Sequence, residues 1–207
     1  MSYCDVANEY QFLNVLGAPG SGKTTFLRRI GLEALLPSSE QKYASIQAPK
    51  DAHVVRSNYH HSCLPVFIEL RRLPIDGEIN LERAILHEFQ VCGFPESERF
   101  VQKALSSGRL LILLDGLDEV AGEYLNQTID HITDFTQRYG RNRFITSCRT
   151  AFYKSAFPHF TDVVLTDFDD FQIEHLIKNW FKKESDLERG VAQQFWKLLR
   201  EERSQAI

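Results

Sequence analysis

The sequence lacks the features that direct a protein out of the cytosol or into a membrane. It has no apolar run of about 18 residues, the length that a membrane-spanning helix needs. The N-terminus lacks the basic and apolar blocks of a signal peptide. The four cysteines are far apart and form no C-x-x-C pair, as is typical of free thiols in a reducing compartment. These absences predict a cytoplasmic protein without a membrane segment.

An excess of positive charge is also absent. The 207 residues carry a formal net charge of −4, so we expect no general nucleic-acid binding. The composition is 43% hydrophobic and 25% charged, which is ordinary globular usage and sufficient to bury a core. This length suits one large domain, or one domain and part of a second.

The most informative stretch is a glycine-rich loop between a predicted strand (10–16) and a predicted helix (25–36). It fits the P-loop, or Walker A, pattern G-x-x-x-x-G-K-[ST]. Glycines let a backbone curl around phosphates, and the N-terminus of the following helix directs its N–H groups at the same point. With both flanks in place, the pattern predicts a nucleoside triphosphate site rather than a simple turn. The residues expected to hold the nucleotide are Gly17, Ala18, Pro19, Gly20, Ser21, Gly22, Lys23, Thr24 and Thr25.

Within the loop, Lys23 is expected to reach the β- and γ-phosphates, and the Thr24 hydroxyl to ligate Mg²⁺. A second motif begins with residues 110–114, which are apolar throughout, as in a parallel strand covered on both faces. The strand runs directly into Asp115, which is the Walker B pattern. Because ligands bind at the carboxyl ends of such strands, we expect Asp115 to meet the same Mg²⁺ as Thr24.

Two further acids follow Asp115. Glu119 is the candidate base that orients an attacking water, and Asp118 is a second acid close to the metal or the base. A later strand, 144–148, ends at Arg149. In P-loop ATPases with an additional strand, a polar residue at this position senses the γ-phosphate, so Arg149 is a candidate sensor. The alternative is an exposed arginine after a strand.

Other polar residues have plainer explanations. Arg71 and Arg72 follow the predicted strand 64–70, and we expect a solvated charge pair there. The polar stretch 37–63 contains residues that suggest a metal site, but their spacing matches no standard zinc pattern. We therefore favour a solvated insertion. The residues concerned are His53, His60, His61 and Cys63.

The remaining pattern alternates helices and strands. We expect a helix over 81–91 capped by Asn80 or Asp76, a helix opened by Pro95 or Glu96, a helix over 123–138 and a strand over 162–165. From about 168 the chain is predicted to be helical, with two apolar stripes that pack on the core or on each other. The alternation by itself predicts a three-layer α/β sheet.

The motifs together resemble the NACHT domain of the STAND class of P-loop NTPases. The resemblance lies in 15–25, 65–71, 113–119 and 145–149. Gly116, followed by the paired acids Asp118 and Glu119, is the feature that separates NACHT domains from most relatives. The segment 169–181 is similar to the start of the helical domain that follows the NTPase core in that family.

This resemblance implies a three-layer fold with a parallel sheet in the order 5-1-4-3-2. It implies a NACHT core over 1–166 and the start of a helical domain over 167–207. The implied activity is slow, Mg²⁺-dependent ATP hydrolysis that runs an ATP/ADP switch for oligomerisation in innate immunity, defence or signalling. The winged-helix, sensor and effector domains of such proteins are not in this chain. We therefore expect a part of a longer, self-associating protein.

Competing functions are a GTPase, a small-molecule kinase, a non-switching P-loop ATPase and an interaction module with a relic P-loop. A GTPase would carry an Asn/Thr-Lys-x-Asp guanine reader, which the sequence lacks. A kinase would not need Asp118 and Glu119 beside the metal. The complete set Lys23, Thr24, Asp115 and Glu119 argues against a relic.

Overall fold

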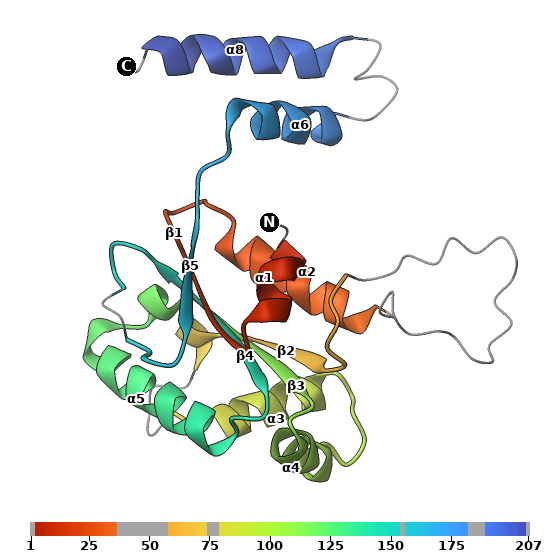
Figure 1. Ribbon diagram of the computed structural model, residues 1–207, viewed down its shortest axis with the longest axis vertical. Helices are drawn as coiled ribbons and strands as arrows, with labels where there is room; N and C mark the ends of the chain where they lie inside the picture. Colours follow the sequence, from red (N-terminus) through yellow and green to blue (C-terminus); the bar gives the residue numbers. More distant parts are fainter. Residues whose placement is uncertain (1–2, 37–57, 74–78, 154–155, 182–188, 206–207) are drawn as a thin grey trace, which may run out of the picture. The chain divides into compact units, whose positions relative to one another are not determined.

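A five-stranded parallel sheet forms the centre of the protein (Figure 1). The computed structural model describes residues 3–36, 58–73, 79–153, 156–181 and 189–205. The strand order is β2-β3-β4-β1-β5, and every neighbouring pair is parallel. This order confirms the expected 5-1-4-3-2 arrangement and is that of the P-loop NTPase fold. The strands are β1 (Phe12–Gly17), β2 (Leu64–Glu69), β3 (Leu110–Asp115), β4 (Arg143–Arg149) and β5 (Thr161–Leu165).

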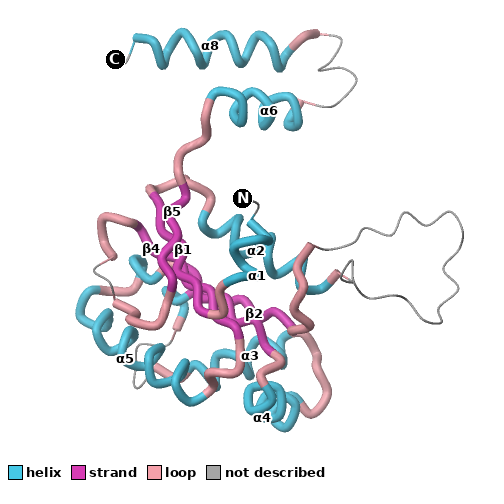
Figure 2. The backbone as a smooth tube through the Cα atoms, viewed as in Figure 1, coloured by secondary structure: helices cyan, strands magenta, loops and turns pink. Residues whose placement is uncertain are grey.

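Helices cover both faces of the sheet, as Figures 1 and 2 show. One face is covered by α1 (Tyr3–Glu9) and α2 (Lys23–Leu35). The other face is covered by α3 (Leu81–Val91), α4 (Ser97–Ser107) and α5 (Gly122–Arg138). Two short 3-10 helices, η1 (Leu70–Arg72) and η2 (Leu117–Glu119), follow the carboxyl ends of β2 and β3.

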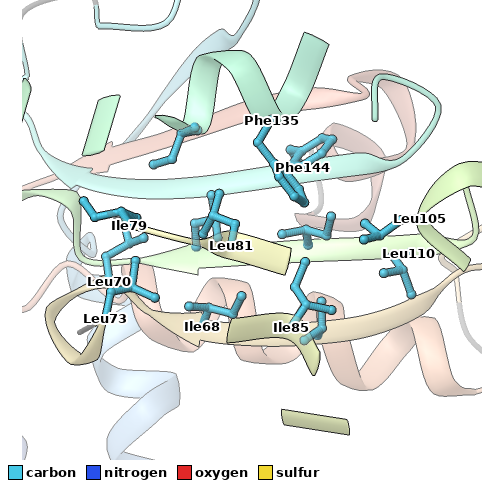
Figure 3. Close-up of a cluster of buried hydrophobic side chains, with 14 of the residues drawn as sticks. Ile68, Leu70, Leu73, Ile79, Leu81, Ile85, Leu105, Leu110, Phe135 and Phe144 are labelled. Carbon is cyan, nitrogen blue, oxygen red and sulfur yellow. The ribbon is translucent and has the colours of Figure 1, made fainter. Parts of the chain in front are cut away.

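The central strand β3 supplies side chains to both layers of the core. Leu111 and Leu113 point to the side of α1 and α2, whereas Leu110, Ile112 and Leu114 point to the side of α3, α4 and α5. Figure 3 shows part of the core on the side of α3, α4 and α5. Successive side chains of a strand alternate between its faces, so a strand covered twice must be apolar throughout. Each fully buried leucine contributes roughly 1.5–3 kcal/mol by leaving water.

Polar side chains tie the elements together at the amino edge, which is the edge of the sheet where the strands begin. The Asn142 side chain donates to Leu105 O (2.8 Å) and Tyr139 O (2.9 Å), and its Oδ1 accepts from Leu110 N–H (3.0 Å). It thereby joins α4, α5 and β3, and its side chain is completely buried.

Arg143 likewise holds α1 by hydrogen bonds to backbone groups. The sequence pattern did not predict this helix. The Arg143 guanidinium donates to the carbonyl oxygens of Ala7 (2.8 Å), Asn8 (3.3 Å) and Tyr10 (2.6 Å). A helix as short as α1 is marginal in isolation. A cation on its last carbonyl groups stabilises it through hydrogen bonds and the helix dipole.

Most predicted elements lie within two residues of the observed ones. Asn80 caps α3 by accepting a hydrogen bond from Arg83 N–H (2.8 Å), whereas Asp76, the other candidate cap, lies outside the described residues. His53 and most of the polar insertion, 37–57, also lie outside them. Among the described residues, no helix is long and apolar enough to cross a membrane.

The contacts divide the chain into two units, Met1–Leu165 and Thr166–Ile207. The described part of the second unit contains α6 (Asp170–Trp180) and α8 (Val191–Gln205) and no strand. A capping box starts α6, since Asp169 accepts from Gln172 N–H and Gln172 accepts from Asp169 N–H. The rings of Phe181 and Phe195 lie 5.7 Å apart, so the two helices touch there, but Phe171, Trp180 and Leu198 stay exposed and the expected packing of the whole stripes is not seen.

Candidate functional site

The residues singled out in the sequence meet at the carboxyl edge, which is the edge of the sheet where the strands end. A cleft of about 320 Å³ lies between the loop after β1 and the ends of β3 and β4. It includes most of the predicted site residues and one that was not predicted, Ser147. The lining residues are Pro19, Gly20, Gly22, Lys23, Thr24, Thr25, Asp115, Gly116, Asp118, Glu119, Ser147 and Arg149.

Glycine conformation shapes the loop after β1. Gly20 and Gly22 have φ of +78° and +93°, the left-handed region that side chains rarely adopt. Gly17 has no such angle, but a Cβ there would collide with Ser21 Oγ. The Ser21 hydroxyl is buried without a hydrogen-bond partner in the described part of the chain. The loop is therefore not saturated by its own hydrogen bonds, as expected of a loop that receives a ligand.

The Lys23 ammonium lies across this loop. Nζ donates to the carbonyl oxygens of Gly17 (3.0 Å) and Ala18 (2.9 Å). Lys23 is also the first residue of α2, whose unpaired N–H groups open toward the cleft. A cation and a helix N-terminus at one point favour an anion.

Asp115 joins the two motifs. Its Oδ2 accepts from the Thr24 hydroxyl at 2.8 Å, and its Oδ1 accepts from the Ser147 hydroxyl at 2.5 Å. Ser147 in turn accepts a hydrogen bond from Gly116 N–H at 2.8 Å. A carboxylate and a hydroxyl are oxygen ligands of the kind that Mg²⁺ takes, so Thr24 and Asp115 fit this ion.

The two acids after Asp115 have different surroundings. The Asp118 side chain is 5% exposed and accepts from Arg149 twice, from its backbone N–H (3.0 Å) and from Nε (2.8 Å). The Glu119 side chain is 43% exposed, and its only ion pair in the described residues is with Arg71, at 3.5 Å. The carboxylate of Asp118 is thus committed to Arg149, whereas that of Glu119 is open to the cleft. This difference favours Glu119 over Asp118 as a base.

Arg149 reaches the cleft, but one side of its guanidinium is bound to Asp118. A role as γ-phosphate sensor remains a prediction, because nothing in the geometry distinguishes it from a purely positioning role. Beside it, burial first and the charge of Asp118 second raise the pKa of the Cys148 thiol to about 12. That thiol stays neutral at ordinary pH and is no nucleophile for the cleft.

The arginines after β2 are solvated, with 55% of the Arg71 and 73% of the Arg72 side chain exposed, and both also pair with Glu69. Glu69 accepts from Arg71 (3.0 and 3.2 Å) and pairs with Arg72 (2.8 Å) and Arg28 (3.9 Å). The pKa of Arg71 is raised, first by its hydrogen bond with Glu69 and then by the charges of Glu69 and Glu119. Exposed ion pairs add only about 0–1 kcal/mol each. Their effect here is to set the position of Arg71 beside Glu119.

Sequence reasoning missed Ser147, Glu69 and the contact between Arg71 and Glu119. Ser147 carried one usable signal: it is a polar residue in a buried strand, two places before Arg149. For the alternative metal site, His60, His61 and Cys63 are described, and they form no metal-binding group with other described residues. These three residues line part of a larger hollow of about 710 Å³ at the amino edge.

Three solved structures show a distant likeness to this chain. No family model matches the chain, and no curated protein matches it. AMPPCP-bound DnaA from Aquifex aeolicus is 16% identical with a TM-score of 0.49, over 92% of this chain and 51% of its own. A DNA replication initiation factor is 14% identical with a TM-score of 0.47, over 87% and 48%. PCH-2 from C. elegans is 13% identical with a TM-score of 0.44, over 86% and 43%.

The chain thus spans about half the length of the first of these structures, 51%. Sequence identities and TM-scores this low indicate only a distant similarity in the path of the backbone. They do not support membership of the NACHT family, which remains a hypothesis from the sequence motifs.

Proposed function

We propose that this chain is a nucleotide-binding P-loop module that binds ATP with Mg²⁺ and hydrolyses it slowly. The observation that carries the proposal is the 2.8 Å hydrogen bond between Thr24 and Asp115. It brings the Walker A and Walker B residues together from positions 91 residues apart in the chain. Lys23 and Glu119 line the same cleft, so the residues for phosphate binding, metal binding and water activation converge.

Each side chain has a role in this proposal. The loop N–H groups and the Lys23 ammonium hold the phosphates, with Lys23 exchanging its carbonyl partners for phosphate oxygens. Thr24 and Asp115 hold the Mg²⁺, which would neutralise charge on the phosphates. Glu119 orients a water molecule and accepts its proton, since its carboxylate is the more accessible one. Arg149 holds Asp118 and directs the rest of its guanidinium to the γ-phosphate.

At a finer level, we propose that the module is an ATP/ADP switch of the NACHT type within a larger, self-associating, cytoplasmic protein of defence or signalling. The support is the motif set that ends in Gly116, Asp118 and Glu119, together with the helical segment that follows the last strand. In this reading residues 1–166 are the NTPase core and 167–207 begin the helical domain. Such a switch requires that its two states differ in affinity for ATP and ADP.

The test is equilibrium binding of ATP, ADP and GTP to this chain, with Mg²⁺ and with EDTA, followed by an assay of phosphate release. We expect binding of ATP and ADP that Mg²⁺ strengthens, and no comparable binding of GTP. Lys23→Ala should weaken ATP binding at least about 100-fold, because no other cation replaces it over the phosphates. Lys103→Ala, which removes an exposed lysine of α4, is the matched control and should bind as the parent does.

Unchanged ATP affinity in Lys23→Ala would contradict the site. Transfer of phosphate to a small-molecule acceptor, rather than to water, would replace the ATPase proposal with a kinase. Hydrolysis without any difference in assembly of the full-length protein between ATP and ADP would leave a P-loop ATPase that does not switch.

A further inference from the structure

Ser147 lies where the backbone pairing of β3 and β4 stops. The register of the two strands runs from Leu111↔Arg143 to Leu114↔Thr146, and Ser147 is the next residue along β4. Its side chain faces the cleft, although the residue is only 1% exposed. Beyond the last backbone pair, the link between the two strands is made by its side chain.

The two neighbours of the Ser147 hydroxyl determine where its proton points. Gly116 N–H donates to the hydroxyl oxygen at 2.8 Å, and Asp115 Oδ1 lies 2.5 Å from the same oxygen. An ionised carboxylate only accepts, so the single hydroxyl proton must point to Asp115. The serine therefore binds two consecutive groups of the turn after β3, the carboxylate of Asp115 and the N–H of Gly116.

We propose that Ser147 is a positioning residue that orients the Asp115 carboxylate for Mg²⁺. This inference rests on the proposed function. The terminal torsion of an aspartate is broad and allows the carboxylate to turn. Here one oxygen is held by Ser147 from β4, and the other faces Thr24 from α2. Once Thr24 binds a cation, Ser147 is, among the residues that the structure describes, the side chain that still holds Asp115 by a hydrogen bond.

The same strand also holds the second acid, since Arg149 binds Asp118 two residues further on. β4 therefore orients Asp115 through a hydroxyl and Asp118 through a guanidinium. Glu119, between them and β2, is contacted by neither. Loss of the Ser147 hydroxyl should consequently weaken Mg²⁺ binding and leave the contacts between the nucleotide and the loop in place.

The experiment measures how strongly Mg²⁺ and nucleotide binding are coupled. The Kd of a fluorescent, non-hydrolysable ATP analogue is measured in EDTA and at saturating Mg²⁺, and the ratio of the two constants gives the coupling. In Ser147→Ala we expect this ratio to fall about 10-fold, the lower end of the usual loss when a side chain that orients a metal ligand is removed. The Kd in EDTA should stay within about twofold of the parent value.

Thr146→Ala is the matched control. It removes the neighbouring buried hydroxyl, which donates to Asn14 Oδ1 (2.7 Å) and makes no contact with Asp115. It should lower stability without changing the ratio. Ser147→Thr, which keeps the hydroxyl, should retain the ratio. If Ser147→Ala does not fold, Ser147→Cys tests the same bond, because a thiol is only a weak donor and acceptor.

A parent-like ratio in a folded Ser147→Ala or Ser147→Cys protein would overturn the positioning role. An equal fall in Thr146→Ala would also overturn it, since the effect would then be one of general stability. Failure of the proposed function looks different, because the parent itself would then show no binding or no Mg²⁺ dependence.

Discussion

Asn142 and Arg143 at the amino edge of the sheet bind a different kind of partner from Asp115 at the carboxyl edge. At the amino edge, Asn142 and Arg143 direct their hydrogen bonds to backbone groups of α4, α5, β3 and α1. At the carboxyl edge, Thr24, Asp115 and Ser147 bind one another through their side chains. Backbone partners belong to the fold and are present in every folded molecule. Side-chain partners can turn away when a ligand offers stronger bonds.

The difference separates structural from functional polar residues within a single sheet. Asn142 is completely buried and Asp115, at the end of β3, is half-buried, but burial alone does not say what each of them binds. Their partners distinguish them. The Asn142 amide gives both of its N–H donors to backbone carbonyl oxygens and its oxygen accepts from a backbone N–H, so it has no donor left for a ligand. A carboxylate held by two hydroxyls, beside a loop of left-handed glycines, can exchange one of them for a cation.

The largest expected effect is at the carboxyl edge. Glu119→Gln should keep ATP binding but lower turnover at least about 100-fold, because the amide has a similar shape and cannot accept a proton from water. Asp118→Asn should mainly weaken the ion pair with Arg149 and lower turnover less than about 10-fold. Binding and single-turnover hydrolysis, measured side by side, check both.

The opposite result would reassign the base. If Glu119→Gln hydrolyses ATP at the parent rate and Asp118→Asn does not, the catalytic base is Asp118, the carboxylate bound to Arg149. In the full-length protein, a correct assignment also predicts that Glu119→Gln stays longer in its ATP state and favours assembly.

At the amino edge we expect a loss of stability alone. Asn142→Ala leaves Leu110 N–H and the carbonyl oxygens of Leu105 and Tyr139 without their partner, which should lower the free energy of unfolding by about 2–3 kcal/mol. Denaturant unfolding measures this loss. Asn126→Ala, an exposed position on α5, is the control and should stay within about 0.5 kcal/mol. Reduced ATP affinity in folded Asn142→Ala would break the distinction between the two edges.

The smallest expected effect concerns the thiols that lie under both edges. Burial is the first cause that raises the pKa of Cys4 to about 11 and that of Cys148 to about 12, from an ordinary 9.0. At pH 8 a thiol reagent should therefore modify the exposed Cys92 first and spare these two, and Cys92→Ser should remove the fast phase.

The sign of the pH dependence follows from the same shifts. Folding holds the Cys4 and Cys148 protons more tightly than the unfolded chain does, so this contribution to stability is complete below pH 9.0. It is lost as the pH rises toward 11 and 12. Unfolding followed between pH 8 and 11 should show falling stability, and a flat profile would contradict it.

The sequence was sufficient for the five strands and for most of the helices, because these depend on local patterns, and it predicted the Walker residues that the structure brings to one cleft. Apolar runs and helical spacing located the strands and α2, and Asn80 was one of two predicted caps of α3, the other being Asp76. The order of the strands came from the NACHT resemblance, since alternation of helices and strands leaves it open.

Features that depend on distant partners were missed. α1 is held by Arg143, more than a hundred residues away in the chain, and Ser147 meets Asp115 across a gap of 32 residues. Likewise, the local sequence did not predict that Arg149 would bind Asp118 and that Glu119 would stay accessible. Pattern reasoning finds residues with the right chemistry, and only the fold decides which of them bind each other.

The register of β1 and β5 determines where the chain leaves the first unit. Gly17, which opens the phosphate loop, lies in register with Leu165, the last residue before the second unit begins. A Cβ at Gly17 would come within 3.3 Å of Leu165 O, so the two backbones are closely apposed there. The chain leaves the sheet on the strand beside the loop, not on a remote one. The last residue of the first unit thus lies beside the first residue of the phosphate loop, in the last of the five pairs that join β1 to β5.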